Sequence, residues 1–117
     1  MKTILIIEND KDNLFVLEYG IKDLGLRVMI SEIIPPLDEI SKLSPALVLL
    51  DHWLTDQTGG DFCKTMKENP MTQGIPVLMI SAHPSIEEIA KASGADDFLP
   101  KPFDLEDLRQ KVQRHIL

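Results

Sequence analysis

The sequence predicts an α/β protein with a doubly wound, five-stranded parallel sheet and helices on both faces. Short β-rich apolar runs alternate five times with segments of helical periodicity, and no linker or low-complexity stretch interrupts them. Successive strand–helix units form a parallel sheet with right-handed crossovers. The chain has 117 residues, fewer than the roughly 150 typical of one domain, so we expect a single domain over residues 1–117.

The composition indicates a globular protein with a real core. Apolar residues make up 44% of the chain and charged residues 26%, which is ordinary globular usage. The longest apolar run, residues 46–50, is far shorter than the roughly 18 residues of a membrane helix, and we expect no signal peptide. The formal charge of −7 has the wrong sign for direct nucleic-acid binding. Cys63 is the only cysteine, which fits a reducing cytoplasm.

The first two strand–helix units begin with an apolar strand at residues 3–7. A helix follows, because apolar residues recur at steps of three and four until Gly25 stops the pattern. This stripe comprises Leu14, Leu17, Ile21 and Leu24. Residues 27–30 form a weaker second strand. Prolines 35 and 36 then introduce a short helix with Leu37, Ile40 and Leu43 on its apolar side.

The third unit begins with residues 46–50, whose continuous apolar character predicts a central strand covered on both faces. A helix opens at Gly59 and ends at Pro70. Residues 77–80 form the fourth strand, and a helix follows it.

Capping signals mark the start of the fourth helix and the start of the last helix. Ser85, with Glu88 three residues later, matches a capping box. The fifth strand is short, at residues 97–99, and Asp104 is placed to cap the last helix. The apolar side of this helix comprises Leu105, Leu108, Val112 and Ile116.

The strand order follows from the number of strands. Doubly wound sheets of five strands commonly have the order 2-1-3-4-5, which brings the carboxyl ends of strands one and three together at the point where ligands bind. Strand five is then an edge. Pro100 fits that place, because proline cannot donate to a central ladder.

Chemically active side chains follow four of the five strands. They are Glu8, Asn9 and Asp10 after strand one, Asp51 after strand three, Ser81 after strand four and Lys101 after strand five. Acids that converge with a lysine and a hydroxyl suit a divalent cation and a transferable phosphoryl group, and a carboxylate can itself be the nucleophile. Asp10 is also placed to cap the first helix.

Over essentially its whole length the chain resembles the receiver domains of two-component response regulators. The resemblance rests on residues 4–10, residues 47–51 with Gly59 eight positions later, residues 77–82, and residues 94–103. It implies a flavodoxin-like fold and a domain that takes a phosphoryl group from a phosphohistidine on a sensor histidine kinase or phosphotransfer protein. The domain would then signal to an unknown downstream protein through a changed surface, and it would assist only its own phosphorylation and dephosphorylation.

The resemblance also implies roles for individual residues. Asp51 is the phosphoacceptor, Lys101 and Ser81 contact phosphoryl oxygens, and Mg²⁺ is held by Glu8, Asn9, Asp51 and the backbone carbonyl of Trp53. Ser81 and Phe98 form the switch, and the Lys101–Pro102 bond is cis. Phosphoryl transfer needs chiefly positioning and neutralisation of charge, which agrees with this set.

Departures from the family pattern bear on metal binding and on phosphoryl lifetime. Asn9 replaces the usual second carboxylate, so we expect weaker Mg²⁺ binding. Thr55 replaces a common proline. Trp53 and His83 stand at positions that in the family flank the path of the hydrolytic water, so we expect them to tune hydrolysis. His115 is expected to be a solvated residue near a helix C-terminus.

Two alternative functions stay open at this point. A degenerate receiver that signals through protein contacts without phosphorylation is suggested by Asn9. An aspartate-nucleophile phosphatase of the haloacid dehalogenase type also has an aspartate after an apolar strand. That class needs a second aspartate two residues later, where this chain has Trp53.

Overall fold

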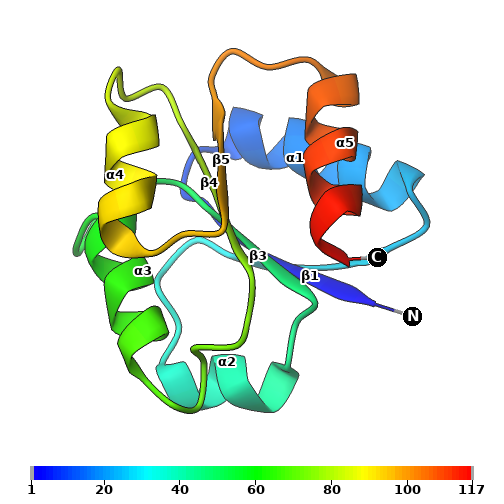
Figure 1. The fold of residues 1–117 in the computed structure, drawn as a ribbon. Coiled ribbons are helices and arrows are strands. Elements are labelled where there is room, and N and C mark those ends of the chain that lie inside the picture. Colours follow the sequence, from blue (N-terminus) through cyan, green and yellow to red (C-terminus); the bar gives the residue numbers. More distant parts are fainter. Residues whose placement is uncertain (1, 117) are drawn as a thin grey trace.

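The computed structural model describes residues 2–116 as one five-stranded parallel sheet with helices on both faces (Figure 1). The strands are β1 (Thr3–Ile7), β2 (Arg27–Ser31), β3 (Leu47–Leu50), β4 (Val77–Ser81) and β5 (Asp97–Pro100). Their order across the sheet is β2-β1-β3-β4-β5, and each neighbouring pair is parallel. The predicted fold class and strand order are confirmed.

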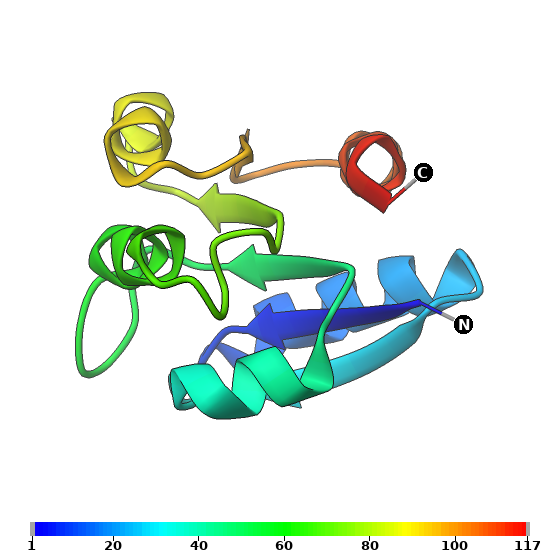
Figure 2. The same cartoon turned by 60° about the horizontal axis from the view of Figure 1, so that its bottom comes forward.

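The described residues form five helices, which divide between the two faces. They are α1 (Lys11–Asp23), α2 (Leu37–Leu43), α3 (Gly59–Glu68), α4 (Ile86–Ser93) and α5 (Leu105–Ile116). Helices α1 to α4 connect successive strands, and α5 follows β5. Helices α1 and α5 cover one face, and α2, α3 and α4 cover the other (Figures 1 and 2). None of the helices in the described part of the chain is long and apolar enough to cross a membrane.

The alternation of side chains along each strand explains why there are two cores. In β1, Ile4 and Ile6 pack with the apolar residues of α1 and α5, whereas Leu5 and Ile7 pack with those of α2, α3 and α4. Successive side chains of a strand point to opposite faces, so a central strand must be apolar at every position. All four residues of β3 are buried, as the continuous apolar run predicts.

The helix ends confirm most of the predicted capping signals. The Asp10 carboxylate accepts hydrogen bonds from two backbone N–H groups of the first turn of α1, and Asp104 accepts one from the first turn of α5. Gly25 has φ 78°, a left-handed conformation that favours glycine. Cys63 is buried in the core.

The predicted capping box at Ser85 is wrong. Ser85 is the N-cap residue of α4, but its side chain makes no capping hydrogen bond. Its φ and ψ of −106° and 30° lie outside the extended region that lets an N-cap hydroxyl reach the first turn. Its backbone N–H instead donates to Nδ1 of His83 at 2.9 Å.

Candidate functional site

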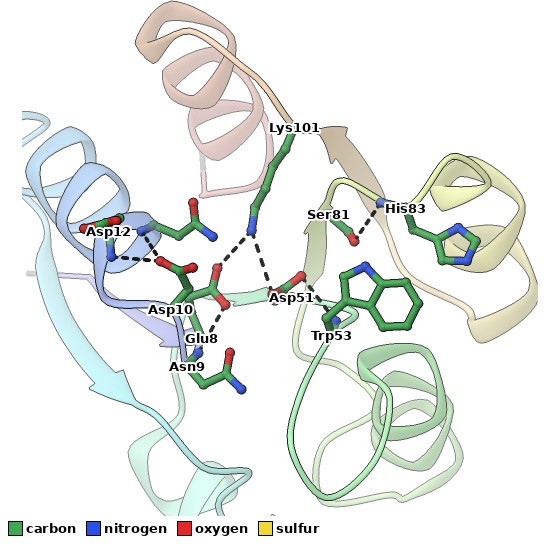
Figure 3. A network of polar contacts seen from close by, with 10 residues as sticks. Glu8, Asn9, Asp10, Asp12, Asp51, Trp53, Ser81, His83 and Lys101 are labelled. Carbon is green, nitrogen blue, oxygen red and sulfur yellow. Dashed lines mark hydrogen bonds and ion pairs between the residues drawn. The ribbon is translucent and has the colours of Figure 1, made fainter.

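The carboxyl ends of β1, β3, β4 and β5 bring four predicted site residues together (Figure 3). Glu8, Asp51 and Ser81 are nearly inaccessible to solvent, with 1%, 7% and 0% of their surface exposed. Lys101 follows the edge strand, and its side chain reaches inward over the sheet. Parallel strands end at the same edge, so residues more than 90 positions apart in the sequence become neighbours.

Lys101 pairs with both buried acids. Its Nζ lies 3.0 Å from Oε1 of Glu8 and 3.8 Å from Oδ2 of Asp51. Its backbone N–H donates to the carbonyl of Ser81 at 2.9 Å, and the Lys101–Pro102 bond is cis. One ammonium group thus neutralises only one of two carboxylates, which leaves the site with one negative charge in excess when both acids are ionised.

The surroundings of Glu8 make its carboxyl a weaker acid. Burial is the largest cause and the neighbouring Asp51 the next, and together they raise the pKa of the Glu8 carboxyl to about 7. Lys101 acts in the opposite direction but only partly offsets them. Ionisation of the second carboxylate is unfavourable because the site lacks positive charge. A divalent cation would supply that charge and stabilise both carboxylates.

The loop after β3 contacts the Asp51 carboxylate, and its end at Gly59 packs closely against the Asp51 backbone. The N–H of Trp53 donates to Oδ1 of Asp51 at 3.3 Å. A Cβ on Gly59 would lie 2.0 Å from the backbone oxygen of Asp51, so only glycine fits there. The N–H of Gly59 also donates to the carbonyl of His52 at 2.8 Å. This contact is the physical reason for a glycine eight residues after the acid.

Asn9 lies at the mouth of the site. Its Nδ2 donates to the hydroxyl of Thr55 at 3.1 Å, and its backbone N–H donates to the Glu8 carboxylate at 3.1 Å. Among residues 2–116 there is no group of three His, Cys, Asp or Glu side chains that could hold a metal. A cation here would therefore depend on two carboxylates, from Glu8 and Asp51, with neutral oxygens completing its shell. That set fits Mg²⁺, which proteins hold with one or two carboxylates together with waters and phosphate oxygens.

Trp53 and His83 form an aromatic cluster with a residue that sequence reasoning did not select, His52. The rings of Trp53 and His83 are stacked, with centroids 5.2 Å apart and planes inclined by 29°. The His52 ring meets Trp53 edge-on at 5.1 Å and His83 at 5.4 Å. Burial, and next the nearby His83, lower the pKa of His52. The sequence did contain a signal for this cluster, because all three aromatic residues lie within two positions of Asp51 or Ser81.

Ser81 and Phe98 lie in different surroundings. The Ser81 hydroxyl accepts a hydrogen bond from the backbone N–H of His83 at 3.1 Å (Figure 3). Phe98 is half-buried against the core beneath α2, α3 and α4, and Nζ of Lys111 lies 5.4 Å from the centroid of its ring. The switch role of both residues stays a prediction.

The prediction for His115 is wrong. Its Nε2 lies 2.9 Å from Asp97, which also pairs with Lys111 at 2.8 Å and Arg114 at 3.2 Å. Burial alone would raise the pKa of Asp97, but hydrogen bonds from Lys111, His115 and the Phe98 N–H outweigh it and lower the pKa to about 2. The pairing was not visible in the sequence because it joins β5 to the last turns of α5.

Buried acids together with a hydroxyl and a lysine at the carboxyl edge of this sheet suit a phosphoacceptor domain. The chain belongs to the response regulator receiver domain family, whose model matches residues 4–113. It is therefore a receiver domain of the two-component response regulator class. In this family the domain is a phosphoacceptor signalling module.

Known proteins and solved structures agree with this assignment. RpaA of Synechocystis sp., a DNA-binding dual master transcriptional regulator, is 38% identical over 74 residues, which cover 62% of this chain and 31% of RpaA. PhoB of Rhizobium meliloti, a phosphate regulon transcriptional regulatory protein, is 28% identical over 116 residues, which cover 94% of this chain and 50% of PhoB. The chain thus spans half or less of the length of these relatives.

Two solved structures superpose over nearly the whole chain. A response regulator of Chloroflexus aurantiacus is 27% identical with a TM-score of 0.87, and the match covers 98% of this chain and 97% of that one. The receiver domain of the sensor histidine kinase PA1611 of Pseudomonas aeruginosa is 24% identical with a TM-score of 0.88, over 98% and 97% of the two chains. That structure has a magnesium ion coordinated in its active-site cleft.

Proposed function

We propose that Asp51 is the phosphoacceptor of this receiver domain and that its donor is a phosphohistidine on a sensor histidine kinase or phosphotransfer protein. The observation that carries the proposal is the ammonium group of Lys101, held 3.0 Å from Glu8 and 3.8 Å from Asp51. A carboxylate at a strand end is unremarkable alone. One with a lysine positioned beside it and a second buried acid is arranged for charged chemistry.

Mg²⁺ is the cofactor that we propose for this site. Glu8, Asn9, Asp51 and the backbone carbonyl of Trp53 are the groups that would hold it, because the Trp53 backbone already lies against the Asp51 carboxylate. When bound, the ion supplies positive charge to the equatorial oxygens of the phosphoryl group. Asn9 contributes a neutral amide oxygen, so binding is weaker than with two acidic neighbours.

The other residues act on the phosphoryl group or respond to it. Lys101 pairs with one phosphoryl oxygen. The Ser81 hydroxyl, which now accepts a hydrogen bond from His83, turns to donate to another. That movement releases the loop between β4 and α4 and favours an inward Phe98. The surface of α4, β5 and α5 then changes for a downstream protein, because the phosphoryl group contacts one state better than the other.

Trp53 and His83 tune hydrolysis of the aspartyl phosphate by flanking the approach of water. The domain, which we place over residues 1–117, turns over no external substrate. We place it in the cytoplasm, without direct contacts to nucleic acid or membrane. Neither the phosphorylation-independent receiver nor the phosphatase is favoured by any contact in the site.

Incubation with acetyl phosphate and Mg²⁺, followed by mass spectrometry, tests the proposal. The wild type and Asp56→Asn should gain one phosphoryl group, and Asp51→Asn should gain none. Asp56 is a matched control, because it is an exposed acid in the same loop. Label that persists in Asp51→Asn would assign the phosphoryl group elsewhere. An unlabelled wild type would favour the degenerate receiver.

A further inference from the structure

Trp53 is a large apolar side chain held at the mouth of the site. It is the only tryptophan in the chain, and 55% of its surface is exposed. Its backbone N–H is bonded to the Asp51 carboxylate, and in Figure 3 the indole stands beside Asp51 and Ser81. An exposed indole that close to a nucleophile can touch whatever approaches that nucleophile.

The rings that support Trp53 are themselves held by the backbone. Nδ1 of His52 accepts the N–H of Gly60 at 3.2 Å, and Nδ1 of His83 accepts the N–H of Ser85 at 2.9 Å. Rotation of either ring would break its hydrogen bond. The two imidazole rings against which the indole packs therefore have fixed orientations.

A supported aromatic surface has little freedom to lose when a ligand binds. Ordering a mobile side chain at an interface costs conformational entropy, and preorganisation avoids that cost. One face of the Trp53 ring packs on His83, with edge contact to His52. The rest of the indole is the exposed part. It offers a flat, electron-rich surface to a flat or cationic group.

The donor of a phosphoryl group to Asp51 brings such a group with it. In the transfer an Asp51 oxygen attacks phosphorus, the phosphorus–nitrogen bond breaks, and its electron pair stays on the ring nitrogen of the donor. When the other ring nitrogen carries a proton, the phosphorylated ring is a cation before transfer and a neutral imidazole afterwards. In-line displacement puts this leaving ring opposite the attacking oxygen, on the solvent side of the site. The indole of Trp53 stands beside Asp51 with 55% of its surface exposed to solvent.

We propose that Trp53 stacks on the imidazole ring of the phosphohistidine and makes Asp51 selective for donors with a flat aromatic leaving group. This inference rests on the proposed role of Asp51 as phosphoacceptor. Stacking holds the leaving ring in line, and the indole favours its cationic, reactive form. His52 and His83 are positioning residues that act through Trp53.

The test compares two small phosphoramidate donors that differ in the leaving group. Phosphoimidazole carries the ring, and phosphoramidate carries ammonia in its place. The measurement is the ratio of their rate constants for phosphorylation of Asp51. We expect Trp53→Leu to lower that ratio about two- to fivefold, which corresponds to the ~0.5–1 kcal/mol of an exposed cation–π contact. Trp53→Phe should keep most of the ratio, because it keeps a ring face.

Tyr19→Leu is the matched control, since Tyr19 is an aromatic residue on α1 with 56% of its surface exposed. It should leave the ratio unchanged. Equal slowing with both donors in Trp53→Leu would overturn the inference, because a merely structural role of Trp53 does not distinguish the leaving groups. An equal effect of Tyr19→Leu would do the same. If neither donor labels the wild type, the phosphoacceptor role fails first and this inference falls with it.

Discussion

Replacing Glu8 by glutamine should change the way in which stability depends on pH. The pKa of Glu8 is raised from 4.5 to about 7, first by burial and then by Asp51. A carboxyl whose folded pKa is raised supports the folded state while it is protonated, and this support is lost as the pH rises through the folded value. Without metal, the wild type should therefore lose stability between about pH 5 and pH 8.

The size of that loss follows from the two pKa values. A shift of about 2.5 units corresponds to about 3 kcal/mol at 1.36 kcal/mol per unit, and most of the change falls between pH 5 and pH 7. The side chain is 1% exposed, so solvent screening takes little from this figure. The neutral amide of Glu8→Gln does not titrate. Relative to wild type, the variant should gain about 2–3 kcal/mol as the pH rises from 5 to 8.

Urea unfolding in a metal chelator at pH 5, 6, 7 and 8 measures this difference. Glu68→Gln is the control, because Glu68 is an exposed acid at the end of α3. A stability difference between Glu8→Gln and wild type that is the same at every pH would refute the reasoning, and so would one that shrinks as the pH rises. Added Mg²⁺ should stabilise the wild type more than the variant, since a ligand of the folded state acts by mass action.

Three other substitutions test separate parts of the structure. Asn9→Asp should bind Mg²⁺ more tightly in a calorimetric titration, because a carboxylate replaces a neutral amide. In chelator the variant should melt at a lower temperature, because a further acid crowds the site. Equal Mg²⁺ affinity would place this side chain outside the metal shell. Gly59→Ala should destabilise the fold by several kcal/mol, since its Cβ would meet a backbone oxygen at 2.0 Å, whereas Gly74→Ala has nothing within 4 Å and should melt like wild type. Asp97→Asn should lower the free energy of unfolding by about 2 kcal/mol at neutral pH. The lowered pKa of Asp97, about 2, means that this carboxylate stabilises the fold above pH 4 and that the contribution is lost as the pH falls toward 2. An unchanged urea midpoint at pH 7 would contradict this.

The sequence alone was sufficient for the architecture and for predicting which strand-end residues lie together. Residues 47–50 are apolar at every position because a central strand of a parallel sheet is covered on both faces. Once five such units are recognised, the strand order places Glu8, Asp51, Ser81 and Lys101 at one edge without knowledge of any side-chain conformation. Local capping signals such as Asp10 succeed for a similar reason, since their partners lie within one helical turn.

What only the tertiary structure decided are the contacts between side chains that approach from different elements. His115 meets Asp97 across 18 residues, and the rings of Trp53 and His83 meet across two loops. Ser85 is of a residue type that commonly caps helices. The loop after β4 gives it backbone angles that keep its hydroxyl from capping the first turn of α4. Periodicity and strand order depend on the average burial of many residues, which a sequence encodes redundantly. A single contact depends on the rotamer and backbone angles at both of its ends, and these are determined only when the whole chain packs.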